Sequence, residues 1–318
     1  YGAISGMVQA LGDPYTVFLT PDQNKDSKEE LSGTFQGIGA QLGLKDKKIV
    51  VIAPLPETPA EKAGIKAGDW IVKIDQKETY NLSLPEAVSK IRGPKGSKVV
   101  LTILHEKETK TVDLEIPRDN ILVKSVELKF INNTAVLKLS QFGDNSNTEW
   151  DNSVTSILNR GSQVQGVVLD LRNNPGGYLD GSVYIASEFI KNGVVVIQDD
   201  GNGGKQEYPV NRPGRLVEKR LVVLVNKGSA SASEIVAGAL QDYGRAKIVG
   251  ENSFGKGTIQ DAQDLNEGAG LHVTVAKWLT PKNRWINGTG LTVDVNVPMD
   301  EKDPTRDPQL DKAIELLK

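Results

Sequence analysis

The sequence predicts a two-part protein in which an α/β domain follows a smaller, β-rich module. Two nearly unbroken apolar runs, GVVLDL at 166–171 and LVVLV at 221–225, each lead into a glycine- or serine-rich turn and then into a helical pattern. Strands that are apolar on both faces and are joined through helices are typical of parallel βαβ units. From residue 33 to residue 117, by contrast, short β-rich runs alternate with turns.

Composition limits the class of protein before any motif is considered. The chain has 318 residues, enough for about two domains with sizeable cores. Its net charge of −3 provides no basic surface, so we expect no nucleic-acid partner. There are no cysteines and only two histidines, His105 and His272, which we expect to be ordinary strand residues. The sequence therefore predicts neither a metal site nor another cofactor.

The N-terminal 32 residues predict a helical segment. AISGMVQAL at 3–11 has the pattern of a short helix, and the Gly12-Asp13-Pro14 turn ends it. No apolar run in the chain approaches the ~20 residues that span a bilayer. Residue 1 is tyrosine rather than methionine, so we expect that an export signal or anchor has been removed.

The β-rich module, residues 33–117, contains signals for two short helices. Thr58 is a good N-cap for the first, and Pro59 suits its first helical position. Ser83 and Glu86 have the spacing of a capping box at the start of the second. The module is therefore β-rich with two helices.

The segment GENSFGKGT at 250–258 resembles a phosphate-binding loop but lacks one essential residue. Gly250, Gly255 and Lys256 fit the pattern Gly-x-x-x-x-Gly-Lys-Ser/Thr. The position that needs a hydroxyl to hold Mg²⁺ is Gly257. We therefore do not predict nucleotide binding, and Lys256 needs another role.

KGSASASEI at 227–235 places serines where an apolar strand gives way to a helix. A serine at a helix N-terminus lies beside unpaired backbone N–H groups, which stabilise a developing oxyanion. The structural alternative is a capping box, because Ser231 and Glu234 are spaced three apart. A nucleophile and a cap are both open at this turn, and the two roles are compatible.

A serine nucleophile needs a base, and neither histidine is a convincing candidate. Lysine serves only when neutral, so its pKa must fall from about 10.4 to near 7, a shift worth ~5 kcal/mol that burial can supply. Lys256 lies between two glycines, and Gln260 lies four residues on, where its amide can hold the amine in line with the serine. Taken alone, each residue also suits a solvated surface position.

DLRNNPGGYLD at 170–180 forms a third turn at the end of an apolar strand. Gly176 and Gly177 let a backbone N–H turn toward a ligand, which would give a second oxyanion donor beside that of Ala232. An ordinary β-to-α turn would have the same sequence. Because α/β sheets bind ligands at the carboxyl ends of their strands, the convergence of three such turns is the stronger argument.

These segments together resemble the carboxy-terminal processing proteases, serine peptidases with a PDZ domain before a Ser/Lys catalytic core. The resemblance covers nearly the whole chain and is carried by LGDPYT, FQGIGA, AGDWIVKID, IRGPKGS, VVLDLRNNPGG, GSASASE and GENSFGKGT. It implies an α/β protease core of the crotonase/ClpP-like class over 118–318, a PDZ domain over 33–117 and an N-terminal helical segment over 1–32. Among family members the chain looks most like Bacillus envelope enzymes of the CtpB type, which include a sporulation protease.

The resemblance also implies roles for individual residues. The implied roles are nucleophile for Ser231, general base for Lys256, orienting residue for Gln260, and oxyanion-hole N–H donors for Ala232 and Gly177, with Gly176 as the alternative to Gly177. The identity of the orienting residue varies within the family, so Gln260 is the least secure of these assignments.

A PDZ domain would explain the first module. PDZ domains bind protein C-termini as an added strand, and a glycine-rich nest of backbone N–H groups holds the terminal carboxylate. Gly37, Ile38 and Gly39 fit that nest, although a tight turn into a strand would look the same. Arg92 follows the second predicted helix and is either a link between peptide occupancy and the protease core or an ordinary surface arginine.

The resemblance therefore implies a serine endopeptidase that recognises the C-termini of envelope proteins and needs no cofactor. We expect an extracytoplasmic location in a bacterial cell envelope, a homodimer, and membrane tethering through a missing N-terminal segment. Two alternatives from other classes stay open. One is a catalytically idle PDZ scaffold that only binds peptides, and the other is an acyl-CoA enzyme.

Overall fold

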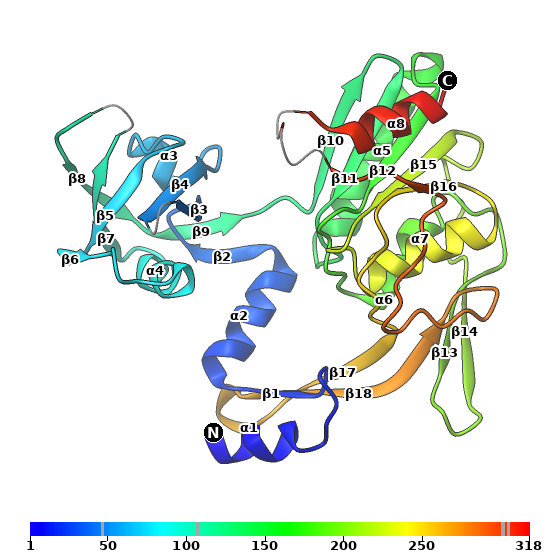
Figure 1. The fold of residues 1–318 in the computed structure, drawn as a ribbon, viewed down its shortest axis with the longest axis horizontal. Coiled ribbons are helices and arrows are strands. Elements are labelled where there is room, and N and C mark those ends of the chain that lie inside the picture. The colour runs from blue at the N-terminus through cyan, green and yellow to red at the C-terminus, as the bar shows by residue number, and fades with distance from the viewer. Residues whose placement is uncertain (46–47, 106–107, 300–302, 304–305) are drawn as a thin grey trace. The chain divides into compact units, whose positions relative to one another are not determined.

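The structure is a computed structural model that describes residues 1–45, 48–105, 108–299, 303 and 306–318 (Figure 1). The chain separates into two compact units, and each is described by itself. The first unit combines Tyr1–Gly33 with Lys124–Lys318, and the second unit is Thr34–Val123. The N-terminal segment thus belongs to the same unit as the α/β core.

The first unit is built on a six-stranded main sheet in the order β10-β11-β12-β15-β16-β19. β10 is antiparallel to β11, and all other neighbours are parallel. The strands are β10 (Val126–Ile131), β11 (Thr134–Leu139), β12 (Gly166–Asp170), β15 (Arg220–Val225), β16 (Lys247–Gly250) and β19 (Val295–Asn296). The two apolar runs of the sequence are β12 and β15, so the predicted parallel α/β core is confirmed.

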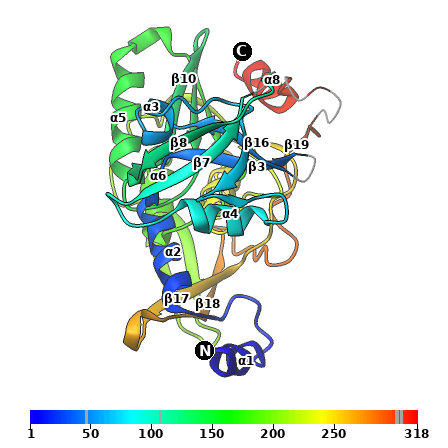
Figure 2. The ribbon, with the colours of Figure 1, turned by 90° about the vertical axis from the view of Figure 1, so that its left-hand side faces the viewer.

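Helices cover both faces of the main sheet, and Figure 2 shows α5 and α8 on opposite sides of it. Leu169 of β12 packs on the same face as Trp150 of α5, whereas Val168 faces Ala313 of α8; all four are fully buried. Alternate residues of one strand thus fill two separate cores, which is why these strands are apolar throughout. The helices are α5 (Ser146–Asn159), α6 (Leu179–Ala186), α7 (Ala232–Asp242), α8 (Pro308–Leu316) and the 3₁₀ turn η1 (Gly161–Gln163).

A second, antiparallel sheet of the first unit follows the order β1-β18-β13-β14, with β17 also paired to β18. The glycine-rich turn 200–204 joins β13 to β14 as a hairpin. The elements are β1 (Val17–Leu19), β13 (Val194–Asp199), β14 (Lys205–Pro209), β17 (Thr258–Asp264), the 3₁₀ turn η2 (Asn266–Gly268) and β18 (Gly270–Leu279). The β17–β18 hairpin brings its strands up to the carboxyl ends of the main sheet.

The N-terminal segment forms two helices, α1 (Gly2–Gln9) and α2 (Pro21–Ser32). Thr20 and Gln23 form a capping box at the start of α2. The buried Asn24 then ties α2 to the β17–β18 hairpin through donors to the backbone oxygens of Gly268 and Ala269. Within the described part of the chain, no helix has the length and apolar character needed to cross a membrane.

The second unit is a small β-rich fold with a core of its own. Its main sheet follows the order β3-β4-β5-β7-β8 with β6 beside β5, and β2 pairs separately with β9. Both predicted helices are present, and the capping box of Ser83 and Glu86 begins α4. The elements are β2 (Thr34–Gly37), β3 (Ala40–Lys45), β4 (Lys48–Pro54), α3 (Pro59–Lys62), β5 (Trp70–Ile74), β6 (Lys77–Glu78), α4 (Leu84–Ile91), β7 (Lys98–Leu104), β8 (Val112–Pro117) and β9 (Asp119–Leu122).

Candidate active site

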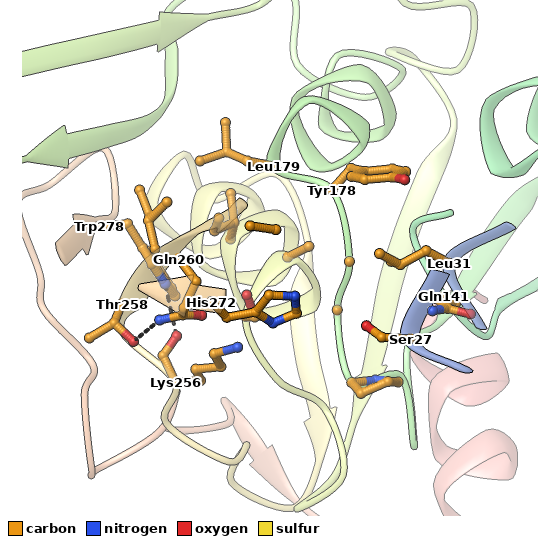
Figure 3. A pocket seen from close by; sticks show the side chains of 18 of the residues that line it. Ser27, Leu31, Gln141, Tyr178, Leu179, Lys256, Thr258, Gln260, His272 and Trp278 are labelled. Atoms are coloured by element: carbon orange, nitrogen blue, oxygen red, sulfur yellow. Dashed lines mark hydrogen bonds between the residues drawn. The ribbon is translucent and has the colours of Figure 1, made fainter. Parts of the chain in front are cut away.

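One cavity of the first unit, about 360 Å³ in volume, is lined by every residue to which the sequence assigns a catalytic role (Figure 3). It lies where the turns after β12 and β15 meet the segment between β16 and β17. These residues are Gly176, Gly177, Ser231, Ala232, Lys256 and Gln260. The three turns singled out in the sequence therefore converge in space.

Ser231 is the N-cap of α7 and has an unusual backbone conformation, with φ 53° and ψ −115°. A non-glycine residue in this region is strained, and such a turn between a strand and a helix is how some hydrolases expose a serine nucleophile. The Gly176 backbone packs tightly against it, because a Cβ on Gly176 would lie 2.9 Å from the Ser231 Cβ. Glycine is therefore required at 176 for the two turns to meet.

Two backbone N–H groups in the cavity are available for an oxyanion. Among the described residues, neither the Ala232 N–H nor the Gly177 N–H has a hydrogen-bond acceptor. The Gly176 N–H, in contrast, donates to the side-chain oxygen of the fully buried Asn174 at 2.9 Å. The geometry thus favours Gly177 over Gly176 as the second donor.

Lys256 is half-buried and lies between Gly255 and Gly257. Burial lowers the pKa of its amine, because the charged form loses water, while the negative charge of Glu234 opposes that shift. Its Nζ lies 5.3 Å from the ring centroid of Tyr15. Within the described chain, Nζ makes no hydrogen bond to Ser231 Oγ or to any other group, so the pair is brought into one cavity but is not joined in this conformation.

Glu234 links the serine turn to the lysine segment. Its carboxylate, fully buried, accepts from the backbone N–H groups of Ser231 at 2.8 Å, Gly255 at 2.6 Å and Lys256 at 2.9 Å, and from the Ser253 hydroxyl at 2.5 Å. Burial raises the pKa of this carboxyl, and the four donors counteract that effect. Spacing alone identified Glu234 as a cap of α7, but it could not reveal the three contacts to the segment some twenty residues further on.

Gln260 lines the cavity but does not contact the lysine in this structure. Its Nε2 donates to Thr258 Oγ1 at 2.9 Å and to Thr274 Oγ1 at 3.2 Å. These bonds hold the amide against the β17–β18 hairpin. Its role in orienting Lys256 stays a prediction.

His272 is a cavity residue that sequence reasoning treated as an ordinary strand residue. It lies on β18 as expected, but Figure 3 shows its ring projecting into the cavity beside Lys256. Burial and the positive charge of Lys256 both lower the pKa of His272. Only the pairing of β18 with β17 reveals this proximity, because the two residues are sixteen positions apart.

The predicted peptide-binding residues of the second unit lie where β2 leads into β3: Gly37 ends β2, and Ile38 and Gly39 connect it to β3. Gly39 has φ +79°, and a Cβ there would lie 2.4 Å from the Thr58 Cβ, so this position needs glycine. β3 lies at one end of its sheet and pairs only with β4 among the described strands. An edge strand directly after the glycine turn is what peptide binding by strand addition requires.

Arg92 follows α4 as its C-cap residue. Its guanidinium carbon lies 4.6 Å from the ring centroid of Phe35 on β2, within the second unit. This contact joins the end of α4 to the strand that enters the unit. A role for Arg92 in coupling the two units stays a prediction.

Comparisons with known proteins agree on one family. The model described as peptidase family S41 matches residues 133–297, and a PDZ domain model matches residues 50–104. The carboxy-terminal processing protease CtpA of Bacillus subtilis (strain 168) is 39% identical over 300 residues, which are 94% of this chain and 64% of that protein. A probable CtpA-like serine protease of Staphylococcus aureus (strain COL) is 40% identical over 298 residues, 93% of this chain and 59% of that protein.

A solved structure, that of a photosystem II D1 C-terminal processing protease, has a TM-score of 0.61 and 32% identity, covering 100% of this chain and 85% of that one. The chain spans less than two thirds of the length of the curated relatives named above. A special closeness to CtpB-type enzymes stays a prediction. The chain belongs to peptidase family S41, in its branch of carboxy-terminal processing proteases that carry a PDZ domain.

Proposed function

We propose that this chain is a serine endopeptidase that binds protein C-termini through its PDZ domain and cuts peptide bonds by a Ser/Lys acyl-enzyme route. The observation that carries the proposal is the single cavity that gathers a strained serine, a partly desolvated lysine and two N–H groups that have no acceptor among the described residues. Relatives named as C-terminal processing proteases support the same activity.

The chemistry follows from these groups. Neutral Lys256 takes the proton from Ser231 Oγ as that oxygen bonds to the carbonyl carbon of the substrate. The carbonyl oxygen becomes an oxyanion, which the N–H groups of Gly177 and Ala232 stabilise. The intermediate collapses as the lysine ammonium returns its proton to the departing amine, leaving an acyl ester on the serine. Water then attacks the ester, with Lys256 as base again, and releases the shortened product.

The lack of a Ser231–Lys256 hydrogen bond in this structure supports low activity in the resting state. The amine must move to the hydroxyl before the reaction begins, and substrate capture is the natural trigger. The edge of β3 and the Gly37-Ile38-Gly39 turn would hold the substrate C-terminus. A peptide without a free terminal carboxylate should therefore be cut more slowly.

A comparison of paired variants and paired peptides tests the proposal. Ser231→Ala and Lys256→Ala should each abolish hydrolysis of an unstructured peptide, whereas the exposed controls Ser162→Ala and Lys227→Ala should cut it normally. The unaltered protein should cut the free-acid peptide faster than the same peptide with an amidated C-terminus. Undiminished cleavage by Ser231→Ala would reject the mechanism.

The same experiment separates the alternatives. Peptide binding without cleavage by the unaltered protein would favour an idle PDZ scaffold. Turnover of an acyl-CoA ester that survives Lys256→Ala would favour an acyl-CoA enzyme. Circular dichroism of every variant shows whether a loss of activity reflects a loss of folding.

We also propose, on the family resemblance alone, an extracytoplasmic location in a bacterial cell envelope, a homodimeric state and membrane tethering through a segment not included in this chain. Regulated proteolysis in sporulation belongs to the same set. Fractionation of cells that express the full-length protein, and its mass in solution, test the first three. Deletion of the gene in a spore-forming host tests the last.

A further inference from the structure

The ammonium of Lys256 lies over the face of an aromatic ring. Nζ lies 5.3 Å from the ring centroid of Tyr15, inside the ~6 Å range in which a cation is attracted to a π face. Among the described residues, no hydrogen bond or ion pair engages this amine. A half-buried lysine with neither is unusual, so the ring contact is the interaction to explain.

The charged and titratable groups around the amine do not replace that contact. Glu234 of α7 is the nearest source of negative charge, but its oxygens accept from backbone N–H groups and from Ser253 rather than from Nζ. His272 of β18 is disfavoured as a cation beside the lysine. Glu30 of α2 lines the same cavity and is exposed to solvent.

Tyr15 is fixed from outside the segment that carries the lysine. The Asp13 carboxylate accepts from the Tyr15 N–H at 3.1 Å and from the Thr16 hydroxyl at 2.6 Å. The same Thr16 oxygen accepts from the N–H of Thr274 on β18 at 3.1 Å. The LGDPYT turn that carries Tyr15 is therefore tied to the β17–β18 hairpin, while Lys256 follows β16.

We propose that Tyr15 is a positioning residue for the catalytic lysine. Its ring holds the ammonium form in a place from which it makes no hydrogen bond to Ser231, and the amine leaves the ring when it loses its proton and takes up the serine hydroxyl. The inference rests on the proposed function, because it assigns Lys256 as the base. It gives the LGDPYT turn, some 240 residues from the lysine in sequence, a part in controlling that base.

The direction in which Tyr15 shifts the titration of Lys256 depends on whether its ring attracts the charged or the neutral amine. A π face stabilises the ammonium and not the neutral amine, so Tyr15 keeps the lysine protonated to a higher pH than an aliphatic side chain would. Tyr15→Leu keeps the site apolar but removes the π face, and should lower the midpoint of lysine titration by about one pH unit. Tyr15→Phe keeps the face and should titrate like the unaltered protein.

The test is residue-specific acetylation of Lys256 by acetic anhydride across a pH series, read by mass spectrometry, which reports the titration midpoint without any need for proteolysis. Tyr178→Leu is the control, because Tyr178 lines the cavity that holds Lys256 and its replacement should leave the midpoint unchanged. The acid limb of kcat/KM for a model peptide should move by the same amount and in the same direction as the acetylation midpoint.

A Tyr15→Leu midpoint equal to or above that of the unaltered protein would overturn the inference, as would Tyr15→Phe behaving like Tyr15→Leu. The outcome is separable from the proposed function. The shift of the acetylation midpoint caused by Tyr15→Leu should persist when Ser231 is also replaced by alanine. The assay therefore tests the contact between Tyr15 and Lys256 even in a protein that cuts no peptides. If the acid limb alone fails to move, Lys256 is not the base.

Discussion

Each of the two units removes a cation from solvent at least in part, and the two cations differ in the hydrogen bonds that they make. Arg118 in the second unit is 8% exposed and donates four hydrogen bonds, to Ile91 O at 2.7 Å, Lys98 O at 2.7 Å, Lys90 O at 3.1 Å and Ser97 Oγ at 3.1 Å. Lys256 in the first unit has no described hydrogen bond from its amine at all. A guanidinium is always charged and is held here by hydrogen bonds, whereas an amine can lose its charge and is held here by no described hydrogen bond.

This difference shows how a structural cation can be told from a chemical one. Burial removes water from both groups, so protein acceptors must replace the water wherever the charge is to persist. Arg118 has such acceptors and ties the end of α4 to the start of β7. Lys256 has no such acceptor among the described residues, and burial lowers the pKa of its amine.

The largest expected effect comes from replacing the lysine. Lys256→Met should reduce kcat/KM for peptide hydrolysis by at least 10²- to 10⁴-fold, the usual range for loss of a general base. It should leave the free energy of unfolding unchanged or raise it, since a poorly solvated amine is lost. The exposed Lys227→Met is the control; equal activity of both variants would remove Lys256 from the chemistry.

Replacing Arg118 should lower stability, whereas replacing Lys256 should lower activity. Arg118→Met leaves three backbone carbonyls of the second unit without their donors, and should destabilise that unit by about 2–4 kcal/mol. Hydrogen exchange of the α4 and β7 amides in the full chain measures this, with the exposed Lys66→Met as the control. Unchanged protection of these amides would mean that Arg118 is not structural.

Glu234→Gln should affect both stability and the lysine. The amide has one acceptor oxygen in place of two and turns an NH₂ toward groups that already donate, which should cost about 1–3 kcal/mol in urea unfolding. It also removes the negative charge that opposes the fall in the Lys256 pKa, so the acid limb of kcat/KM should move to lower pH. The exposed Glu207→Gln is the control and should change neither the stability in urea nor the acid limb of kcat/KM. If Glu234→Gln also changed neither, Glu234 would not link the serine turn to the lysine segment.

The smallest expected effect is a pH dependence of stability. The pKa of Lys256 is lower in the folded chain than its ordinary value of 10.5, so the unfolded chain binds more protons between the two values. The lysine's contribution to the unfolding free energy should therefore rise with pH through that window and level off above it. Urea unfolding at several pH values, compared with Lys256→Met, isolates the contribution; a difference that does not vary with pH would mean that the lysine titrates normally.

Local signals predicted much of the fold. The runs GVVLDL and LVVLV gave β12 and β15 because strands buried on both faces are apolar throughout, and the Ser83–Glu86 spacing gave the start of α4. The helix α2 was less evident, since Asn24 is its one buried residue among those described and it has no apolar stripe to detect. Its Thr20–Gln23 capping box was nevertheless visible in the sequence.

The candidate site was predictable in its residues but not in its connections. Turn chemistry and family motifs pointed to Ser231, Lys256 and the glycine turn, all of which line one cavity. They could not show that Glu234 holds both the serine and the lysine segments, or that Tyr15 lies over the lysine. Those contacts join segments that are distant in sequence, and no local pattern encodes them.

The backbone at Ser231 has a consequence for evolution. A side chain held at φ 53° costs on the order of 1–3 kcal/mol, a cost that glycine would largely avoid. A lineage selected for robustness alone would drift toward glycine here and lose its hydroxyl. Serine in so unfavourable a conformation thus exchanges stability for a hydroxyl placed in the cavity.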